Sequence, residues 1–363
     1  MPALDEASVL NAVTALRDPL TGHAYTARQL SGVRIDGGNV ALTLTLGYPA
    51  RSQHAALAED IGAAVRALPG VASVDVSVRS EVIAHAVQRG VQLLPGVKNI
   101  IAVASGKGGV GKSTTAVNLA LALAAEGANV GILDADIYGP SQPMMLGVSG
   151  QPQSDDGKTM APMRAHGLQV MSIGFLVNEG QAMIWRGPMA TQALEQLLRQ
   201  THWQDLDYLV VDMPPGTGDI QLTLSQRVPV TGAVIVTTPQ DIALLDARKG
   251  LAMFEKVQVP ILGVVENMAV HTCTNCGHVE HIFGAEGGQK MAAQHGIPYL
   301  GGLPLKLSIR EQTDAGRPTV VSEPDSAEAA QYRAIARKIA AQIAEKAKDY
   351  SSKFPTITIS KNT

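Results

Sequence analysis

The chain has 363 residues, 45% of them hydrophobic, which is enough for about two globular domains with a sizeable core. Aromatic residues make up only 4%, while Gly and Pro are frequent, so the composition favours an α/β architecture over an aromatic-rich β sandwich. The net charge of −3 is scattered, no apolar run is long enough to span a membrane and the amino terminus lacks a signal-peptide pattern. We therefore expect a cytoplasmic protein that binds neither nucleic acid nor membranes.

Residues 1–80 have the pattern of a small α+β domain. Capping residues precede two stretches in which apolar residues recur at helical spacing. Turn residues separate two segments whose apolar residues have the pattern of strands. The predicted elements are a helix capped by Asp5, a hairpin of strands 33–35 and 40–46, a helix capped by Ser52 that runs to about Leu68, and a strand over 74–78. The order is α-β-β-α-β.

Residues 81–98 have weak periodicity with a Pro-Gly break, and we interpret them as a linker. Over residues 99–350, short unbroken apolar runs alternate with helical stretches. Such runs are typical of strands buried on both faces, so we expect a mostly parallel, doubly wound sheet covered by helices. The predicted strands are 100–104, 130–133, 208–211, 233–236 and 261–265.

The last long helix is predicted over residues 326–348, with four apolar residues on one ridge. The ridge is narrow and lacks a dense basic face, which favours core packing over a membrane anchor. Residues 351–363 are expected to form a flexible tail. The ridge residues are Tyr332, Ile335, Ile339 and Ile343.

A phosphate-loop motif lies between the first predicted strand of the larger region and its helix. Residues 106–113 read GKGGVGKS, which satisfies G-x-x-x-x-G-K-S in a strand-to-helix context. Its backbone N–H groups converge on phosphate oxygens, Lys112 would neutralise the β and γ phosphates, and Ser113 would ligate Mg²⁺. A glycine-rich turn without a ligand is the alternative. The expected nucleotide-binding residues here are Gly106, Lys107, Gly108, Gly109, Val110, Gly111, Lys112, Ser113 and Thr114.

Lys107 is a second lysine that a generic phosphate loop does not require. The stretch KGGVGKST at 107–114 resembles the deviant phosphate loop of the MinD/ParA/nitrogenase iron-protein group of P-loop ATPases. This resemblance implies that Lys107 reaches the nucleotide bound by the facing subunit of a homodimer. A solvated surface lysine is the alternative.

Carboxylates follow two of the predicted strands, at Asp134, Asp136 and Asp212. Because carboxyl ends of parallel strands share one edge, these side chains are expected beside the phosphate loop. The resemblance and the logic of phosphoryl transfer assign Asp212 to the Mg²⁺ shell, Asp134 to its support and Asp136 to orienting the attacking water. Together with Lys107 and Lys112, they predict an ATPase.

Asn267 follows the predicted strand 261–265. It lies where ATPases of the resembled group place an asparagine that reads adenine. An ordinary turn asparagine is the alternative.

The only two cysteines, Cys273 and Cys276, stand close together in the chain. Two thiolates at this spacing can clamp one metal. A 4Fe–4S cluster generally takes four cysteines, and a twofold symmetric dimer would supply them. The alternatives are zinc held with two of His271, His278 and His281, a redox pair, or two inert cysteines.

The whole pattern resembles the Mrp/ApbC family of iron-sulfur cluster carrier proteins. The resemblance implies a homodimer that slowly hydrolyses ATP with Mg²⁺ and carries a 4Fe–4S cluster from an assembly scaffold to apoprotein clients. A MinD/ParA-like positioning ATPase and a zinc-binding regulator are the other hypotheses. Beyond KGGVGKST, the matching stretches are DADIYGPS at 134–141, WRGPM at 185–189, DMPPGTGD at 212–219 and CTNCG at 273–277.

Residues 1–80 resemble the small domain of metal-sulfur cluster assembly factors. Related domains often carry Cys-Pro after the hairpin, whereas this chain has Tyr48-Pro49. We therefore expect this region to serve in docking or client recognition, without a thiol role.

Overall fold

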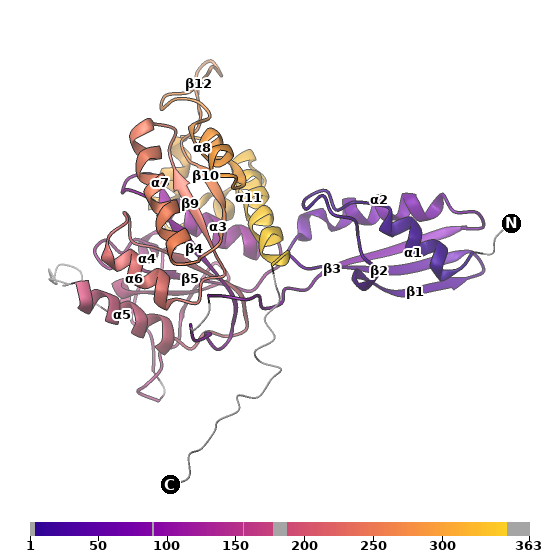
Figure 1. The fold of residues 1–363 in the computed structure, drawn as a ribbon, viewed down its shortest axis with the longest axis horizontal. Coiled ribbons are helices and arrows are strands. Elements are labelled where there is room, and N and C mark those ends of the chain that lie inside the picture. Colours follow the sequence, from indigo (N-terminus) through magenta and orange to yellow (C-terminus); the bar gives the residue numbers. More distant parts are fainter. Residues whose placement is uncertain (1–3, 89–90, 155, 177–186, 347–363) are drawn as a thin grey trace, which may run out of the picture.

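The computed structural model describes residues 4–88, 91–154, 156–176 and 187–346, which form a smaller and a larger unit (Figure 1). In the smaller unit, two helices pack beside a three-stranded sheet of order β1-β2-β3. β1 and β2 form the predicted hairpin, and β3 lies parallel to β2. The order α-β-β-α-β is confirmed. The elements are α1 (Glu6–Thr14), β1 (Leu30–Asp36), β2 (Asn39–Leu46), α2 (His54–Arg66) and β3 (Ser73–Ser80), with short 3₁₀ turns at Ala27–Gln29 and Arg51–Gln53.

The two predicted helix caps of the smaller unit have different outcomes. Asp5 caps α1, because its carboxylate accepts a 2.8 Å hydrogen bond from the backbone N–H of Ser8. Ser52 does not cap α2, so that prediction was wrong. Its N–H and hydroxyl both donate to the carboxylate of Glu126 in the larger unit, at 2.9 and 2.7 Å. A tertiary acceptor has therefore replaced the local capping interaction.

The larger unit is built on an eight-stranded sheet of order β13-β10-β9-β4-β8-β5-β7-β6. All neighbouring strands are parallel except β6 and β7, which confirms the expected doubly wound α/β fold. The five predicted strands are present, and β6, β7 and β13 were not predicted. The strands are β4 (Val97–Ala104), β5 (Val130–Asp134), β6 (Met163–Ala165), β7 (Leu168–Ser172), β8 (Leu206–Asp212), β9 (Gly232–Thr237), β10 (Ile261–Glu266) and β13 (Tyr299–Gly302).

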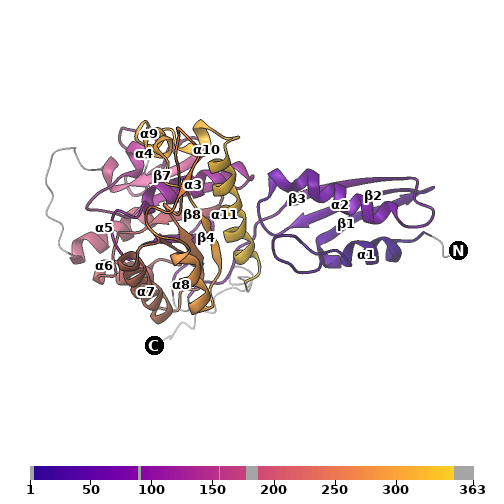
Figure 2. The same cartoon turned by 90° about the horizontal axis from the view of Figure 1, so that it is seen from above.

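Helices cover both faces of this sheet (Figure 2). α3, α4, α9, α10 and α11 pack together on one face, while α5, α6, α7 and α8 follow one another on the other. Their bounds are α3 (Lys112–Ala125), α4 (Gln142–Met145), α5 (Gly187–Gln200), α6 (Asp219–Arg227), α7 (Asp241–Lys256), α8 (Gly287–His295), α9 (Leu307–Asp314), α10 (Thr319–Ser322) and α11 (Ala327–Ala344). A 3₁₀ turn spans Ile173–Phe175, and a separate hairpin is formed by β11 (His271–Thr272) and β12 (Val279–Glu280).

The apolar ridge of α11 lies in the core, as its pattern predicted. Its four ridge residues are each 2% exposed or less. The helix ends at Ala344, earlier than predicted, and both Lys348 and the expected tail lie outside the described residues. None of the helices described here is long and apolar enough to cross a bilayer.

Candidate nucleotide and cluster-binding site

The phosphate loop joins β4 to α3, and backbone conformation or close contacts require glycine at three of its positions. Gly109 and Gly111 have φ of +82° and +79°, a region that side chains rarely adopt. A Cβ atom on Gly106 would lie 2.2 Å from the backbone of Asp246, and one on Gly111 would lie 2.1 Å from the amide of Asn267. Since α3 begins at Lys112, the loop presents a helix amino terminus, where anions are favoured.

The predicted charged residues meet at the carboxyl end of β8. The buried ammonium of Lys112 contacts the carboxylate of Asp212 and lies 3.2 Å from the hydroxyl of Ser113. Gln142 joins this group, because its amide donates to Asp212 Oδ2 at 2.9 Å and to the carbonyl of Ser113 at 3.1 Å. Gln142 was not predicted, although it directly follows the stretch DADIYGPS.

Asp134 lies beside Asp212 on the neighbouring strand. One of its oxygens accepts hydrogen bonds from the N–H groups of Ser141 and Gln142 at 2.9 and 3.0 Å and from the hydroxyl of Ser172 at 3.1 Å. Burial, together with the charge of Asp212, raises the pKa of Asp134 to about 7. The carboxyl group thus fixes the start of α4, and with it Gln142, against the phosphate loop.

Asp136 is half-buried next to this cluster. Burial raises its pKa, and the positive charge of Lys112 opposes that shift. A carboxylate so placed can accept a hydrogen bond from a water beside the phosphate loop, which is the chemistry that the predicted water-orienting role requires.

Lys107 is partly exposed at the loop. Within the described ranges, its ammonium forms no ion pair, whereas Lys112 does. Its backbone carbonyl accepts a 2.9 Å hydrogen bond from Ser105. The side chain is thus available to a ligand from outside the chain.

Asn267 lines a cavity of about 180 Å³ beside the phosphate loop, which we call the Asn267 cavity. Its amide donates to the carbonyl of Val110 at 2.9 Å, so the side chain oxygen is left to accept from a ligand. The lining from residues 304–332 was not predicted, because no motif marks it. These lining residues are Pro304, Leu305, Lys306, Ile309, Arg310, Thr313, Asp314 and Tyr332.

Cys273 and Cys276 lie in the loop of the β11–β12 hairpin, which projects from the larger unit (Figure 1). Cys276 is exposed and Cys273 partly so, and both thiols are free. The N–H of Gly277, whose φ is +73°, donates to the carbonyl of Cys273 at 2.9 Å. Hydrogen bonds from the N–H groups of Cys276 and Asn275 lower the pKa of Cys273. The loop therefore favours the thiolate, the form that binds metals.

The three histidines near the cysteines are engaged differently. His271 Nδ1 lies 3.0 Å from the carbonyl of Leu305, and His281 Nδ1 lies 3.1 Å from that of Ala269. His278 is exposed. In the part of the chain that the structure describes, no three Cys, His, Asp or Glu side chains gather into a metal site.

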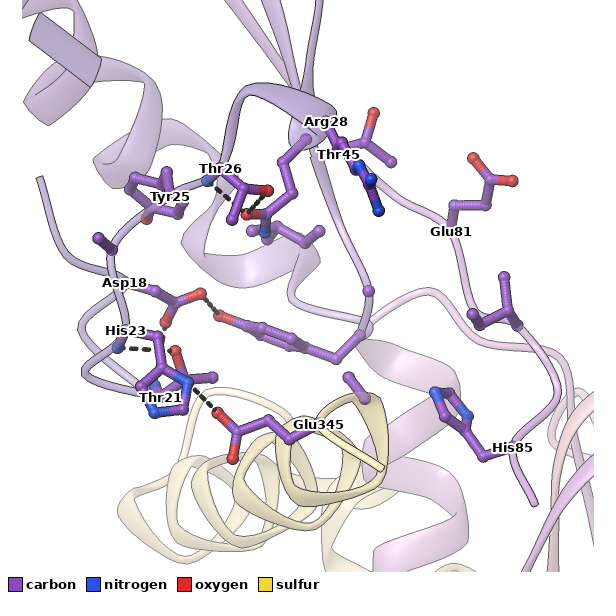
Figure 3. Close-up of a pocket in the computed structure, with 17 residues that line it drawn as sticks. Asp18, Thr21, His23, Tyr25, Thr26, Arg28, Thr45, Glu81, His85 and Glu345 are labelled. Carbon is purple, nitrogen blue, oxygen red and sulfur yellow. Dashed lines mark hydrogen bonds and ion pairs between the residues drawn. The ribbon is translucent and has the colours of Figure 1, made fainter. Parts of the chain in front are cut away.

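A second cavity, of about 460 Å³, lies where the smaller unit meets the end of α11 (Figure 3). The buried hydroxyl of Tyr48 donates a 2.7 Å hydrogen bond to Asp18 there, and His23 pairs with Glu345 at 2.7 Å. Burial raises the pKa of Tyr48, so its hydroxyl stays protonated. Tyr48 precedes Pro49, where related small domains often have cysteine, and it occupies this position as a core hydrogen-bond donor.

Comparisons with known proteins cover both units. A family model described as NUBPL iron-transfer P-loop NTPase matches residues 96–340, and one described as iron-sulfur cluster assembly protein matches residues 6–78. The iron-sulfur cluster carrier protein of Escherichia coli K12 is 66% identical over 249 residues, 68% of each chain. That of Synechocystis is 47% identical over 93% of this chain and 97% of its own. A solved nucleotide-binding protein from Archaeoglobus fulgidus, in complex with ADP, is 37% identical with a TM-score of 0.56, covering 64% of this chain and 90% of that one.

Proposed function

Because the chain belongs to the NUBPL iron-transfer P-loop NTPase family, we propose that it is an iron-sulfur cluster carrier that binds and slowly hydrolyses ATP. Two copies hold a 4Fe–4S cluster between them through Cys273 and Cys276 of each. The carrier receives the cluster from an assembly scaffold and passes it to apoproteins. The observation that carries this proposal is the pair of free thiols, the only two in the chain, on a projecting hairpin, with Cys276 exposed and Cys273 partly exposed.

The geometry of the thiol pair suits a cargo that must be released. Since a cubane cluster generally takes four thiolates, one chain offers half of its ligands. A second copy of the chain, related by a twofold axis through the hairpin tips, would supply the other two thiolates. With Cys276 exposed, an acceptor thiol can approach the cluster directly and replace one ligand at a time.

The residues around the phosphate loop fit a nucleotide with Mg²⁺. The hydroxyl of Ser113 and the carboxylate of Asp212 are oxygen ligands of the kind that Mg²⁺ prefers. Gln142 adds a third oxygen, because its buried Oε1 has no hydrogen-bond partner among the described residues. Ser113 and Asp212 would hold the ion, Asp212 mostly through water, and Gln142 Oε1 can accept from such a water. When bound, Mg²⁺ withdraws charge from the phosphate oxygens.

Side chains of the protein have separate roles in nucleotide binding and hydrolysis. Lys112 neutralises the β and γ phosphates, and Asp136 orients the attacking water and accepts its proton. Lys107 of each copy reaches the phosphates bound by the other. In the Asn267 cavity, the oxygen of Asn267 accepts a hydrogen bond from the exocyclic amino group of adenine.

Anaerobic reconstitution with iron and sulfide tests the carrier function. We expect the visible absorption of a 4Fe–4S cluster and about two iron atoms per chain, in a dimer. The double variant Cys273→Ala/Cys276→Ala should bind no cluster, while Thr274→Ala, an exposed residue between them, should load normally.

Two outcomes would refute the proposal: a wild-type chain that gains no cluster, or a double variant that still does. Recovery of one zinc ion per chain under the same conditions would support the zinc-binding regulator. Competition of ATP and GTP for a fluorescent ADP analogue tests the base preference separately. We expect ATP to compete and GTP to compete weakly.

A further inference from the structure

The base of the cysteine hairpin is hydrogen-bonded to a segment of the larger unit that runs beside the Asn267 cavity. Residues 269–271, which lead into β11, run beside residues 303–305. The N–H of Ala269 donates to the carbonyl of Leu303 at 2.9 Å, and the N–H of Leu305 donates to the carbonyl of Val270 at 2.7 Å. Leu305 also lines the Asn267 cavity.

His271 supplies the last bond of this ladder. Its Nδ1 lies 3.0 Å from the carbonyl oxygen of Leu305. A carbonyl can only accept, so the Nδ1 of His271 carries the proton and donates it. His271 is partly buried, whereas residues 274–282 are all exposed. The hairpin tip therefore has little packing of its own, and its orientation depends on the bonds at its base.

The same chain segments thus line the Asn267 cavity and lead into the cysteine hairpin. Residues 267 and 268 line the Asn267 cavity, and Cys273 follows five residues after Met268. A base that enters the cavity meets Leu305, whose carbonyl holds His271, and His271 is two residues from Cys273. A shift of Leu305 moves the acceptor on which the hairpin base is fixed.

We propose that His271 is a positioning residue that couples occupancy of the Asn267 cavity to the orientation of the cysteine pair. The inference rests on the proposed function for the identity of both ligands. Nucleotide binding changes the accessibility of the two thiols through the His271–Leu305 bond. By thermodynamic reciprocity, cargo on the thiols changes the affinity for nucleotide by the same factor.

The test measures how fast iodoacetamide alkylates the full-length, cluster-free chain with and without saturating Mg²⁺ and ADP. In the wild type we expect the alkylation rate with ADP to differ from the rate without it by about fivefold or more. In the His271→Ala variant, the ratio of the alkylation rates with and without ADP should fall below about twofold. The affinity of this variant for ADP should stay close to that of the wild type. His271→Asn, which retains a side-chain N–H donor, should restore most of the ratio.

His278→Ala is the matched control. His278 is also two residues from a cysteine, but it is exposed, and the side-chain hydrogen bond to the Leu305 carbonyl is made by His271. Its variant should keep the wild-type ratio. A wild-type rate that does not respond to ADP overturns the inference, as does a His271→Ala ratio equal to that of the wild type.

The result of the alkylation test can be distinguished from that of the reconstitution that tests the carrier function, because alkylation needs no cluster. If the wild type loads a cluster but His271→Ala keeps the full ratio, only the coupling fails. If the wild type does not load a cluster, the carrier function fails whatever the alkylation rates are.

Discussion

The hydroxyl of Ser52 in the smaller unit donates a 2.7 Å hydrogen bond to Glu126, the C-cap residue that directly follows the phosphate-loop helix α3. Arg337 of α11 donates to the same carboxylate at 2.5 Å, and the Glu126 side chain is fully buried. One carboxylate therefore joins both units. α3 has 14 residues, and at ~1.5 Å per residue it spans about 20 Å from this junction to the phosphate loop.

Glu126→Ala should destabilise the protein by about 3–5 kcal/mol, because it leaves the guanidinium of Arg337 without its buried partner. Urea unfolding followed by circular dichroism measures the loss. Glu59→Ala removes an exposed pair with Arg66 in the smaller unit and should change the transition little. A Glu126→Ala loss no larger than that of Glu59→Ala would show that the junction contributes nothing to stability.

The sequence predicts most of the large sheet because buried parallel strands leave unbroken apolar runs, as in 208–211. β6, with three residues, and β13, with four, are too short for such a signal. The phosphate loop was predictable because its motif is continuous. The contact of Ser52 with Glu126 joins residues 74 positions apart, and that of Asn267 with Val110 joins residues 157 apart. No local rule specifies such partners.

Asp136→Asn should retain ATP binding and lower the rate of hydrolysis by about 100-fold or more, because an amide cannot accept a proton from the attacking water. Phosphate release and binding of a fluorescent ATP analogue measure the two properties. Asp156→Asn, in an exposed turn, is the control and should hydrolyse ATP at the wild-type rate. Unchanged turnover in Asp136→Asn would remove this residue from the proposed mechanism.

Lys107→Ala should leave folding stability intact, because the structure shows no ion pair of this side chain within the described residues. It should nevertheless reduce ATP hydrolysis and ATP-dependent dimerisation, since the proposed partner of its ammonium is the phosphate bound by the other copy. Sedimentation velocity with and without ATP measures the dimer. The exposed Lys158→Ala is the control. A Lys107→Ala dimer as stable as the wild-type dimer contradicts the facing-subunit role.

The pair of Glu195 with Arg227 should make stability pH-dependent in the acid range. The hydrogen bond from Arg227 lowers the pKa of Glu195 below its ordinary value of 4.5. The folded state therefore gains stability above pH 4.5 and loses it as the pH falls through the lowered value. Glu195→Gln should lose no more than about 1 kcal/mol at pH 7. Its difference from the wild type in urea unfolding should shrink as the pH falls below 4.5, and a constant difference would contradict this assignment.

The placement of only two thiols on each hairpin has a consequence for mixtures of chains. In the proposed homodimer, random pairing of equal amounts of wild-type chain and the cysteine-free double variant would leave about one quarter of the dimers with four thiolates. A defective copy of this gene would thus act dominantly, by occupying partners, and its severity would depend on how freely the dimers exchange subunits.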